Sequence, residues 1–276
     1  MTISVNTNAS ALVALQNLDK TNDNLTGVQE RISTGLKVGT AKDNASVWAI
    51  AQGQRADIGA LGAVKSSLDR AASIADVALA AGATVSDLLN EVKAKVVAAQ
   101  DPSLDTTSRA AIDNDFKSLL RQISDIVNNA EFDGANILNG SDPSIKFLTN
   151  ADATSTITLV AKNMSLGGAI ITMASTASIT TLTNAAAMLS QINTSIANVN
   201  AALGELGSRS KEIEAHNTFV SKLSDVLETG VGNLVDADMA RESARLQALQ
   251  VQQQLGVQAL SIANSSPQMI LNLFKS

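Results

Sequence analysis

Apolar residues recur with helical spacing along the stretch from residue 61 to residue 99. Twelve of them follow one another at alternating three- and four-residue steps: Leu61, Val64, Leu68, Ala71, Ala75, Ala78, Gly82, Val85, Leu89, Val92, Val96 and Ala99. A helix turns once in about 3.6 residues, so this spacing places all twelve on one face. Because the stripe continues for about five heptads, it predicts a long helix that packs against partner helices as in a coiled coil. At about 1.5 Å of rise per residue, the stripe alone would span roughly 58 Å.

Residues on either side of the stripe predict where this helix begins and ends. Thr40 and Asp43 have the T-x-x-D spacing of a helix-capping start. Gln100-Asp101-Pro102 predicts the end, because proline cannot continue the hydrogen-bond ladder of a helix. After a turn, a further helix is predicted from an apolar stripe at Ile112, Phe116, Leu119, Ile123 and Ile126.

A second long seam occupies the carboxy-terminal half of the chain. Its members are Leu189, Ile192, Ile196, Val199, Leu203, Leu206, Ser210, Ile213, Asn217, Val220, Ser224 and Leu227. Three of these positions are polar, and a polar residue in a helical seam fixes the register against its partner. We therefore expect Asn217 to set the pairing of this helix.

Both ends of the chain lack charge. Residues 1–18 carry no charged side chain, and none occurs over the 29 residues from Leu246 to Phe274, where seven glutamines alternate with apolar residues. A helix with apolar and neutral polar residues all round is expected to pack on several sides. We expect the two ends to contact each other and further copies of the chain, and a pair that only dimerises in solution is the alternative. The candidate self-assembly residues are Leu12, Leu15, Leu18, Leu25, Ile32, Leu246, Leu249, Val251, Leu255, Leu260 and Ile262.

The stretch from residue 149 to residue 183 differs in composition. Thirteen of its 35 residues are Ser or Thr, and only Asp152 and Lys162 are charged. Two short strands are predicted, at 157–160 and 169–172, with Gly167-Gly168 between them. The predicted fold is therefore mainly α, with long antiparallel helices in coiled-coil or bundle packing and a small β-hairpin insertion.

Composition narrows the possible functions. Hydrophobic residues make up 45% of the chain but aromatic residues only 2%, which suits close packing of helices. The absence of cysteine excludes disulfides and thiolate chemistry, and a net charge of −6 without a basic run argues against nucleic-acid binding. The first 18 residues do not resemble a secretory signal peptide, and no run of 18 apolar residues predicts a membrane span. On these grounds alone the protein would be expected in the cytosol.

Few residues are candidates for chemistry. The single histidine, His216, lies in a helical seam with no second metal ligand nearby, so we expect a solvated or interface role. Asp236 and Asp238 precede a helix and are interpreted as capping and first-turn acids. Asp113 and Asp115 are interpreted as members of ion pairs at four-residue spacing along one helix. We predict neither an enzyme nor a bound cofactor or metal.

Several segments, taken in order along nearly the whole chain, resemble one family, the bacterial flagellins. The resemblance is carried by Ser4–Asn8 with Ala11-Leu12, Arg31–Lys37 followed by Ala41–Ala45, Asn128–Gly140, Leu234–Ala240, Gln252–Gly256 and Ala259–Asn264. It implies a subunit that is exported unfolded through the flagellar type III apparatus and polymerises at the distal tip of an extracellular swimming filament. The implied partners are other flagellin subunits, the hook-associated junction and cap proteins and an export chaperone. A junction protein or a secreted coiled-coil effector is the alternative, because both share helical ends.

The resemblance also implies a domain plan. Residues 1–36 and 235–276 would form the inner coiled coil, the D0 part of the family. Residues 37–140 and 185–234 would form the helical shell, called D1, and residues 141–184 a short surface insertion. We expect the charge-free ends to be disordered in the free monomer, because they cannot bury their apolar stripes there.

Two surface features follow from the same resemblance. Some flagellins carry sugars on surface hydroxyls, and the candidates here are Thr154, Ser155, Ser165, Thr172, Ser175, Thr176, Ser178 and Thr180. Many flagellins carry an L-Q-R-I-R-E-L run that the innate immune flagellin receptor recognises. In this sequence Glu91 stands where that run has arginine, and Lys95 where it has leucine. We expect this departure to weaken recognition by the receptor.

Overall fold

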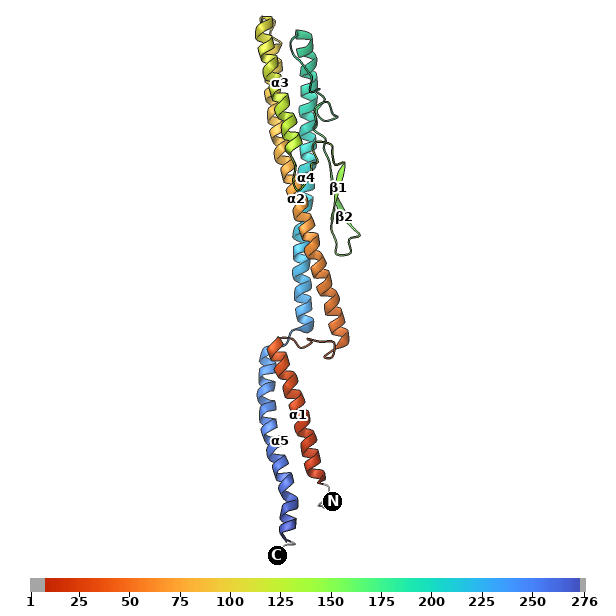
Figure 1. Cartoon of the computed structure of the whole chain (residues 1–276), viewed down its shortest axis with the longest axis vertical. Coiled ribbons are helices and arrows are strands. Elements are labelled where there is room, and N and C mark those ends of the chain that lie inside the picture. Colours follow the sequence, from red (N-terminus) through yellow and green to blue (C-terminus); the bar gives the residue numbers. More distant parts are fainter. Residues whose placement is uncertain (1–7, 274–276) are drawn as a thin grey trace. The chain divides into compact units, whose positions relative to one another are not determined.

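The computed structural model describes residues 8–273, with side chains described as far as Ser265. Helices dominate this part of the chain (Figure 1): α1 (Ala9–Thr34), α2 (Ala45–Ala99), α3 (Thr106–Asn129), α4 (Leu182–Val235) and α5 (Met239–Leu273). Between α3 and α4 lies a two-stranded sheet of β1 (Ser144–Leu148) and β2 (Thr156–Val160). The chain divides into two compact units, one of Met1–Ala56 with Val226–Ser276 and the other of Asp57–Asp225. A mainly α fold with a small β insertion is confirmed.

The predicted stripe of α2 forms the core of the unit 57–225. All twelve of its members are buried. Helices α3 and α4 run alongside α2 (Figure 1), and contacts such as Lys95 with Asp115 and Ser86 with Asn200 join them to it. Among the described helices, α2 is also apolar and long enough to cross a membrane, judged by length and composition alone. A helix that buries an apolar stripe in a protein core, as α2 does, has the same length and apolar composition.

The start of α2 differs from the prediction by a few residues. The side-chain oxygen of Asn44 accepts a hydrogen bond from the amide of Val47 at 3.1 Å, so Asn44 is the N-cap. The carboxylate of Asp43 instead accepts bonds from the amides of Gly39 and Thr40, at 3.1 and 2.9 Å. The predicted T-x-x-D capping start is therefore wrong, because this pair closes the preceding turn. The end of α2 at Ala99, ahead of Pro102, is as predicted.

The core-facing side of α3 overlaps the predicted one, because Phe116, Leu119 and Ile123 of the predicted stripe are buried. Its buried residues are Arg109, Asp113, Phe116, Leu119, Leu120, Ile123 and Val127. Ile112 and Ile126 of the predicted stripe are only half-buried. Four buried positions lie outside the predicted stripe: Leu120 and Val127, which are apolar, and Arg109 and Asp113, which a search for apolar residues could not find because they are polar.

The sheet confirms one predicted strand and corrects the other. β2 covers the predicted 157–160, and it pairs antiparallel with β1, with Ser144 opposite Val160 and Leu148 opposite Thr156. Residues 169–172 are not a strand. The side-chain amide of Asn198 on α4 donates to the carbonyl oxygens of Ala169 and Ile170, at 3.3 and 3.2 Å. These carbonyls therefore bond a helix side chain in place of a neighbouring strand.

Helix α4 carries the predicted long seam in modified form. The predicted seam members Ile192, Val199, Leu206, Ser210, Ile213 and Val220 are buried, and Leu189, Ile196, Leu203 and Leu227 are half-buried. Up to residue 202, four buried positions lie outside the predicted seam: Ala185, Met188, Ser195 and Ala202. The side-chain amide of Asn217 donates to Asp69 on α2, a polar contact of the kind expected to set register.

Candidate self-assembly surface

The two terminal helices pair with each other along a regular seam (Figure 1). On α5 the seam residues recur at four- and three-residue steps and are buried or half-buried: Glu242, Leu246, Leu249, Gln253, Gly256, Leu260 and Ala263. Asn8 donates to the carbonyl of Ala263 at 2.8 Å, and Gln253 donates to the side chain of Asn22 at 2.7 Å. Residues later in α1 thus meet residues earlier in α5, so the pair is antiparallel.

Backbone hydrogen bonds also join the segment that follows α1 to the segment that precedes α5. The amide of Lys37 donates to the carbonyl of Val235 at 2.7 Å, and that of Ala237 donates to Gly35 at 2.8 Å. Gly35 has a φ of +73°, a left-handed conformation that glycine adopts without strain, and it ends α1. Asp238 accepts bonds from two amides of the first turn of α5, at 3.1 Å each, which confirms its predicted capping role.

A second apolar stripe lies on the opposite side of α5 from this seam. Its members also follow heptad-like steps, and all are exposed: Ala244, Ala248, Val251, Leu255, Ala259 and Ile262. Val251, Leu255 and Ile262 are 55%, 58% and 71% exposed. We call this set the outer stripe of α5. A helix with two apolar stripes has one more than its intrachain partner can cover.

Comparison with known proteins identifies the family. The model of the bacterial flagellin N-terminal helical region matches residues 5–142, and that of the flagellin C-terminal helical region matches residues 175–274. The chain belongs to the bacterial flagellin family. It is 51% identical to flagellin FljJ of Caulobacter vibrioides over 280 residues, covering 100% of this chain and 99% of that protein. It is 40% identical to a flagellin of Brucella melitensis, covering 99% of each chain.

A solved structure agrees on the fold. The crystal structure of Bacillus cereus flagellin matches with a TM-score of 0.50 and 18% sequence identity, over 56% of this chain and 88% of that one. Family membership makes the protein a structural subunit of the bacterial flagellar filament, an extracellular polymer of flagellin, and not an enzyme.

In this flagellin the predicted self-assembly residues fall into two groups. Six of them face the α1–α5 seam and are buried or half-buried: Leu18, Leu25, Ile32, Leu246, Leu249 and Leu260. Five are exposed on the outside of the pair: Leu12, Leu15, Val251, Leu255 and Ile262. The sequence pattern treated them as one set because both stripes of α5 have helical spacing. Only the second group is available to another copy of the chain.

The glutamines of α5 lie mainly outside the seam. Gln253 is the member that bonds across to α1, whereas the other glutamines up to Gln258 are exposed. The side chain of Gln268 lies outside the described residues. Neutral amides can exchange hydrogen bonds with a neighbouring surface without the desolvation cost of a charge.

Glu242 is the exception in the seam. Its carboxylate is largely buried, and one oxygen lies 3.6 Å from a guanidinium nitrogen of Arg31. Its other oxygen is buried with no hydrogen-bond partner among the described residues. Its position in the first turn of α5 favours a negative charge there, because that end of the helix dipole is positive.

The remaining predicted residues have structural or surface positions. The Nε2 of His216 donates to the carbonyl of Thr149 at 2.8 Å, because a carbonyl can only accept, so this histidine anchors the turn after β1. Glu91 is exposed, and Lys95 forms an ion pair with Asp115 on α3 at 2.7 Å. Over the described residues, no group of three or more His, Cys, Asp and Glu side chains could hold a metal ion.

The hydroxyl candidates differ in their contacts. Ser165 donates to the carbonyl of Asn139 at 3.2 Å, Ser178 donates to Asp113 at 2.9 Å, and Thr172 bonds to α4. Thr154 accepts a bond from the side chain of Asn150. The other four, which are Ser155, Ser175, Thr176 and Thr180, are exposed.

Proposed function

We propose that this flagellin polymerises through the outer stripe of α5, seated on the terminal helices of neighbouring copies. The observation that carries the proposal is a second heptad-like stripe that is exposed and, from Ala248 onward, lies in a segment free of charge. Burying a Val, Leu or Ile side chain stabilises an interface by about 1.5–3 kcal/mol each. A partner surface for such a stripe must itself be uncharged, and the charge-free parts of the terminal helices are residues 9–18 of α1 and 246–273 of α5.

The remaining parts of the family plan are proposals for this chain as well. Residues 1–36 and 235–276 would form an inner domain, supported by the bonds that join Gly35 and Lys37 to Ala237 and Val235. Residues 37–140 and 185–234 would form the shell, and residues 141–184 a short surface insertion. Head-to-tail contacts between copies give a ring where the rotation closes and a helical fibre where it does not, and the proposed filament is the second case.

The proposal also includes the export of the chain before it polymerises. The chain would leave the cell unfolded through the flagellar type III apparatus, assisted by an export chaperone. It would be added at the distal tip with the help of junction and cap proteins. Family membership supports this route, and a strain lacking the flagellar export apparatus should retain the protein inside the cell.

The outer stripe can be tested separately from the seam. Leu255→Gln removes an exposed apolar side chain, and its neighbour Gln254→Ala is the matched control on the same turn. We expect Leu255→Gln to raise the monomer concentration needed for seeded polymerisation about tenfold or more, because 1.4 kcal/mol corresponds to a factor of ten. Circular dichroism of the monomer should not change. Polymerisation equal to that of Gln254→Ala would exclude the outer stripe as an assembly surface.

We also propose weak recognition by the innate immune flagellin receptor. Glu91 presents a carboxylate, and the amine of Lys95 is held by Asp115. Restoring the family residues with Glu91→Arg and Lys95→Leu should increase signalling by dilute monomer in receptor-bearing cells. Strong signalling by the unaltered protein would contradict the proposal.

Sugar attachment is proposed only for the exposed hydroxyls of the insertion. Ser178 is the weakest of the eight candidates, because its hydroxyl is engaged by a buried carboxylate. Intact-mass measurement of protein from native filaments would show whether any sugar is present, and a mass equal to that of the bare chain would refute the proposal.

A further inference from the structure

Part of the insertion is neither helix nor strand and packs against α3 and α4. It comprises residues 163–181, and we call it the strap. Its apolar side chains Met164, Ile171, Met173 and Ile179 are completely buried. The strap is therefore part of the core of the unit 57–225, and how it is fastened affects that core.

The first part of the strap is fastened to α4 by neutral groups. The amide of Asn198 holds the carbonyls of Ala169 and Ile170. The hydroxyl of Ser195 accepts a bond from the amide of Thr172 at 3.1 Å. None of these groups changes its charge with pH, so this attachment is the same in acid and in neutral solution.

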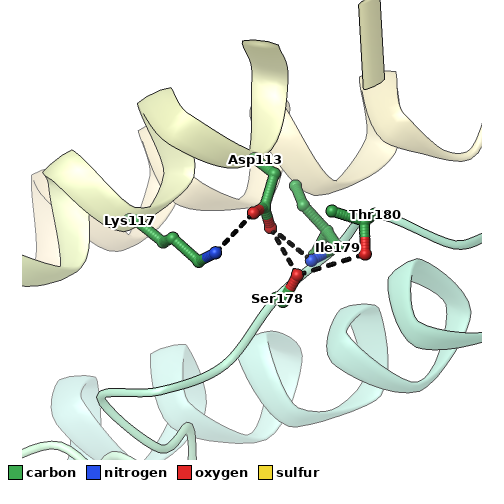
Figure 2. Close-up of polar contacts among 5 residues, drawn as sticks. All are labelled: Asp113, Lys117, Ser178, Ile179 and Thr180. Atoms are coloured by element: carbon green, nitrogen blue, oxygen red, sulfur yellow. Dashed lines mark hydrogen bonds and ion pairs between the residues drawn. The ribbon is translucent and has the colours of Figure 1, made fainter. Parts of the chain in front are cut away.

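The last part of the strap is fastened by one carboxylate. Figure 2 shows Asp113 of α3 pointing at the strap, where it accepts bonds from the amide of Ile179 at 2.6 Å and the hydroxyl of Ser178 at 2.9 Å. Lys117 lies on its other side at 2.7 Å. The side chain of Asp113 is 4% exposed. Among the described contacts, the hydrogen bonds from residues 174–180 to other elements all end on this carboxylate.

Few other charges reach this junction. Residues 163–204, which include the strap and the first turns of α4, contain no charged residue. On α3, Arg109 is engaged with the carbonyls of Ala99, Asp101 and Leu104. On α2, Lys95 is paired with Asp115. Asp113 and Lys117 are therefore the ionisable pair at the end of the strap.

We propose that Asp113 is an acid-sensitive latch, whose protonation releases residues 174–181 from α3 while the helices stay folded. A protonated carboxyl loses its attraction to Lys117 and keeps less acceptor capacity for Ile179 and Ser178. The ammonium of Lys117, whose side chain is 41% exposed, then loses its counter-charge and no longer holds the carboxyl in place, which favours opening of the junction.

The pH at which the latch opens follows from the surroundings of the carboxyl. Burial by itself raises the pKa of Asp113, but the bonds from Lys117, Ile179 and Ser178 outweigh it, so the pKa lies below its ordinary value. A group with a lowered pKa stabilises the folded state above its unfolded pKa, and that contribution is lost as pH falls through the folded pKa. The latch is closed at neutral pH and opens only in acid.

The absence of cysteine makes a direct test simple, because a single introduced thiol is labelled uniquely. A spin label at Thr176→Cys, which is exposed, reports the mobility of the strap in the full chain by electron paramagnetic resonance. We expect mobility to rise on acidification at a pH where the circular dichroism of the helices has not changed. Asp113→Asn should be mobile already at neutral pH, whereas Asp115→Asn, two residues away and exposed, should behave like the unaltered protein.

A second set of variants keeps the carboxylate and tests the sign of the effect. Ser178→Ala and Lys117→Met each remove a group that favours the charged form, so each should shift the transition to higher pH. An unshifted or lower midpoint would overturn the latch. So would a strap that loosens only together with the loss of helical dichroism, or equal mobility of Asp113→Asn and Asp115→Asn.

Discussion

At the scale of single residues, two buried polar side chains of α3 hold the chain where other elements end or begin. Arg109 binds the carbonyls that follow the last turn of α2, with distances of 3.1 and 3.2 Å to Asp101 and Leu104 and a further bond to Ala99. One turn later, Asp113 binds the segment that leads into α4. The carbonyl of Ala99 is one that the end of α2 leaves without an intrahelical partner, whereas Asp101, Leu104 and Ile179 lie in the segments that connect the helices. Their spacing of four residues puts both on the buried face of α3.

Replacing Arg109 tests this role. Arg109→Met keeps the length of the side chain and leaves three carbonyls without their donor, and hydrogen bonds to charged groups contribute about 1.5–3 kcal/mol each. We expect the free energy of unfolding, measured with urea, to fall by about 2–4 kcal/mol. Arg121→Met on the exposed face of the same helix is the control and should change it by less than about 0.5 kcal/mol. Equal effects of the two substitutions would contradict the assignment.

At the scale of secondary-structure elements, regular repeats could be predicted from the sequence and side-chain anchors could not. The stripe of α2 was readable because each step is set by helical geometry within one segment. The alternation of Ile145 and Phe147 with polar residues could also have revealed β1. By contrast, the conformation of residues 169–172 depends on Asn198 of α4, which lies 29 residues beyond Ala169 along the chain. Val251, Leu255 and Ile262 of the outer stripe were among the predicted self-assembly residues, but their separation from the residues that face α1 required the structure.

The packing of α2 against α4 depends on a close approach at Gly82. A Cβ at this position would lie 2.5 Å from Cδ2 of Leu203 and 3.6 Å from Cε of Met164. Overpacking costs about 1–3 kcal/mol, whereas alanine gains up to about 1 kcal/mol over glycine in a helix. Gly82→Ala should therefore lower the free energy of unfolding by about 1 kcal/mol. Gly62→Ala, in the same helix with open space around it, should raise it, and thermal unfolding of both variants gives the comparison.

At the scale of the whole molecule, the chain returns on itself, so residues from both ends form one unit and residues 57–225 the other. The two units differ in how well their helices are covered. In the unit 57–225, the stripe of α2 is completely covered by its neighbours. In the other unit, α1 and α5 cover one stripe each and leave the outer stripe exposed. In the proposed assembly this difference would disappear in the polymer, because neighbouring copies would cover the outer stripe.

This difference predicts uneven stability along the free monomer. A pair of helices with one shared seam buries little apolar surface, and isolated helices are marginal in water. In hydrogen exchange followed by mass spectrometry, residues 9–34 and 239–265 should exchange faster than residues 61–99 in dilute monomer. The terminal segments should become protected in filaments, because local opening then requires separating several copies. The monomer of Leu255→Gln should exchange like the unaltered monomer, since that side chain is exposed and lies outside the seam with α1. If the terminal helices were as protected from exchange as α2 in the monomer, the α1–α5 seam alone would be sufficient to order them. Order in these helices would then not depend on assembly.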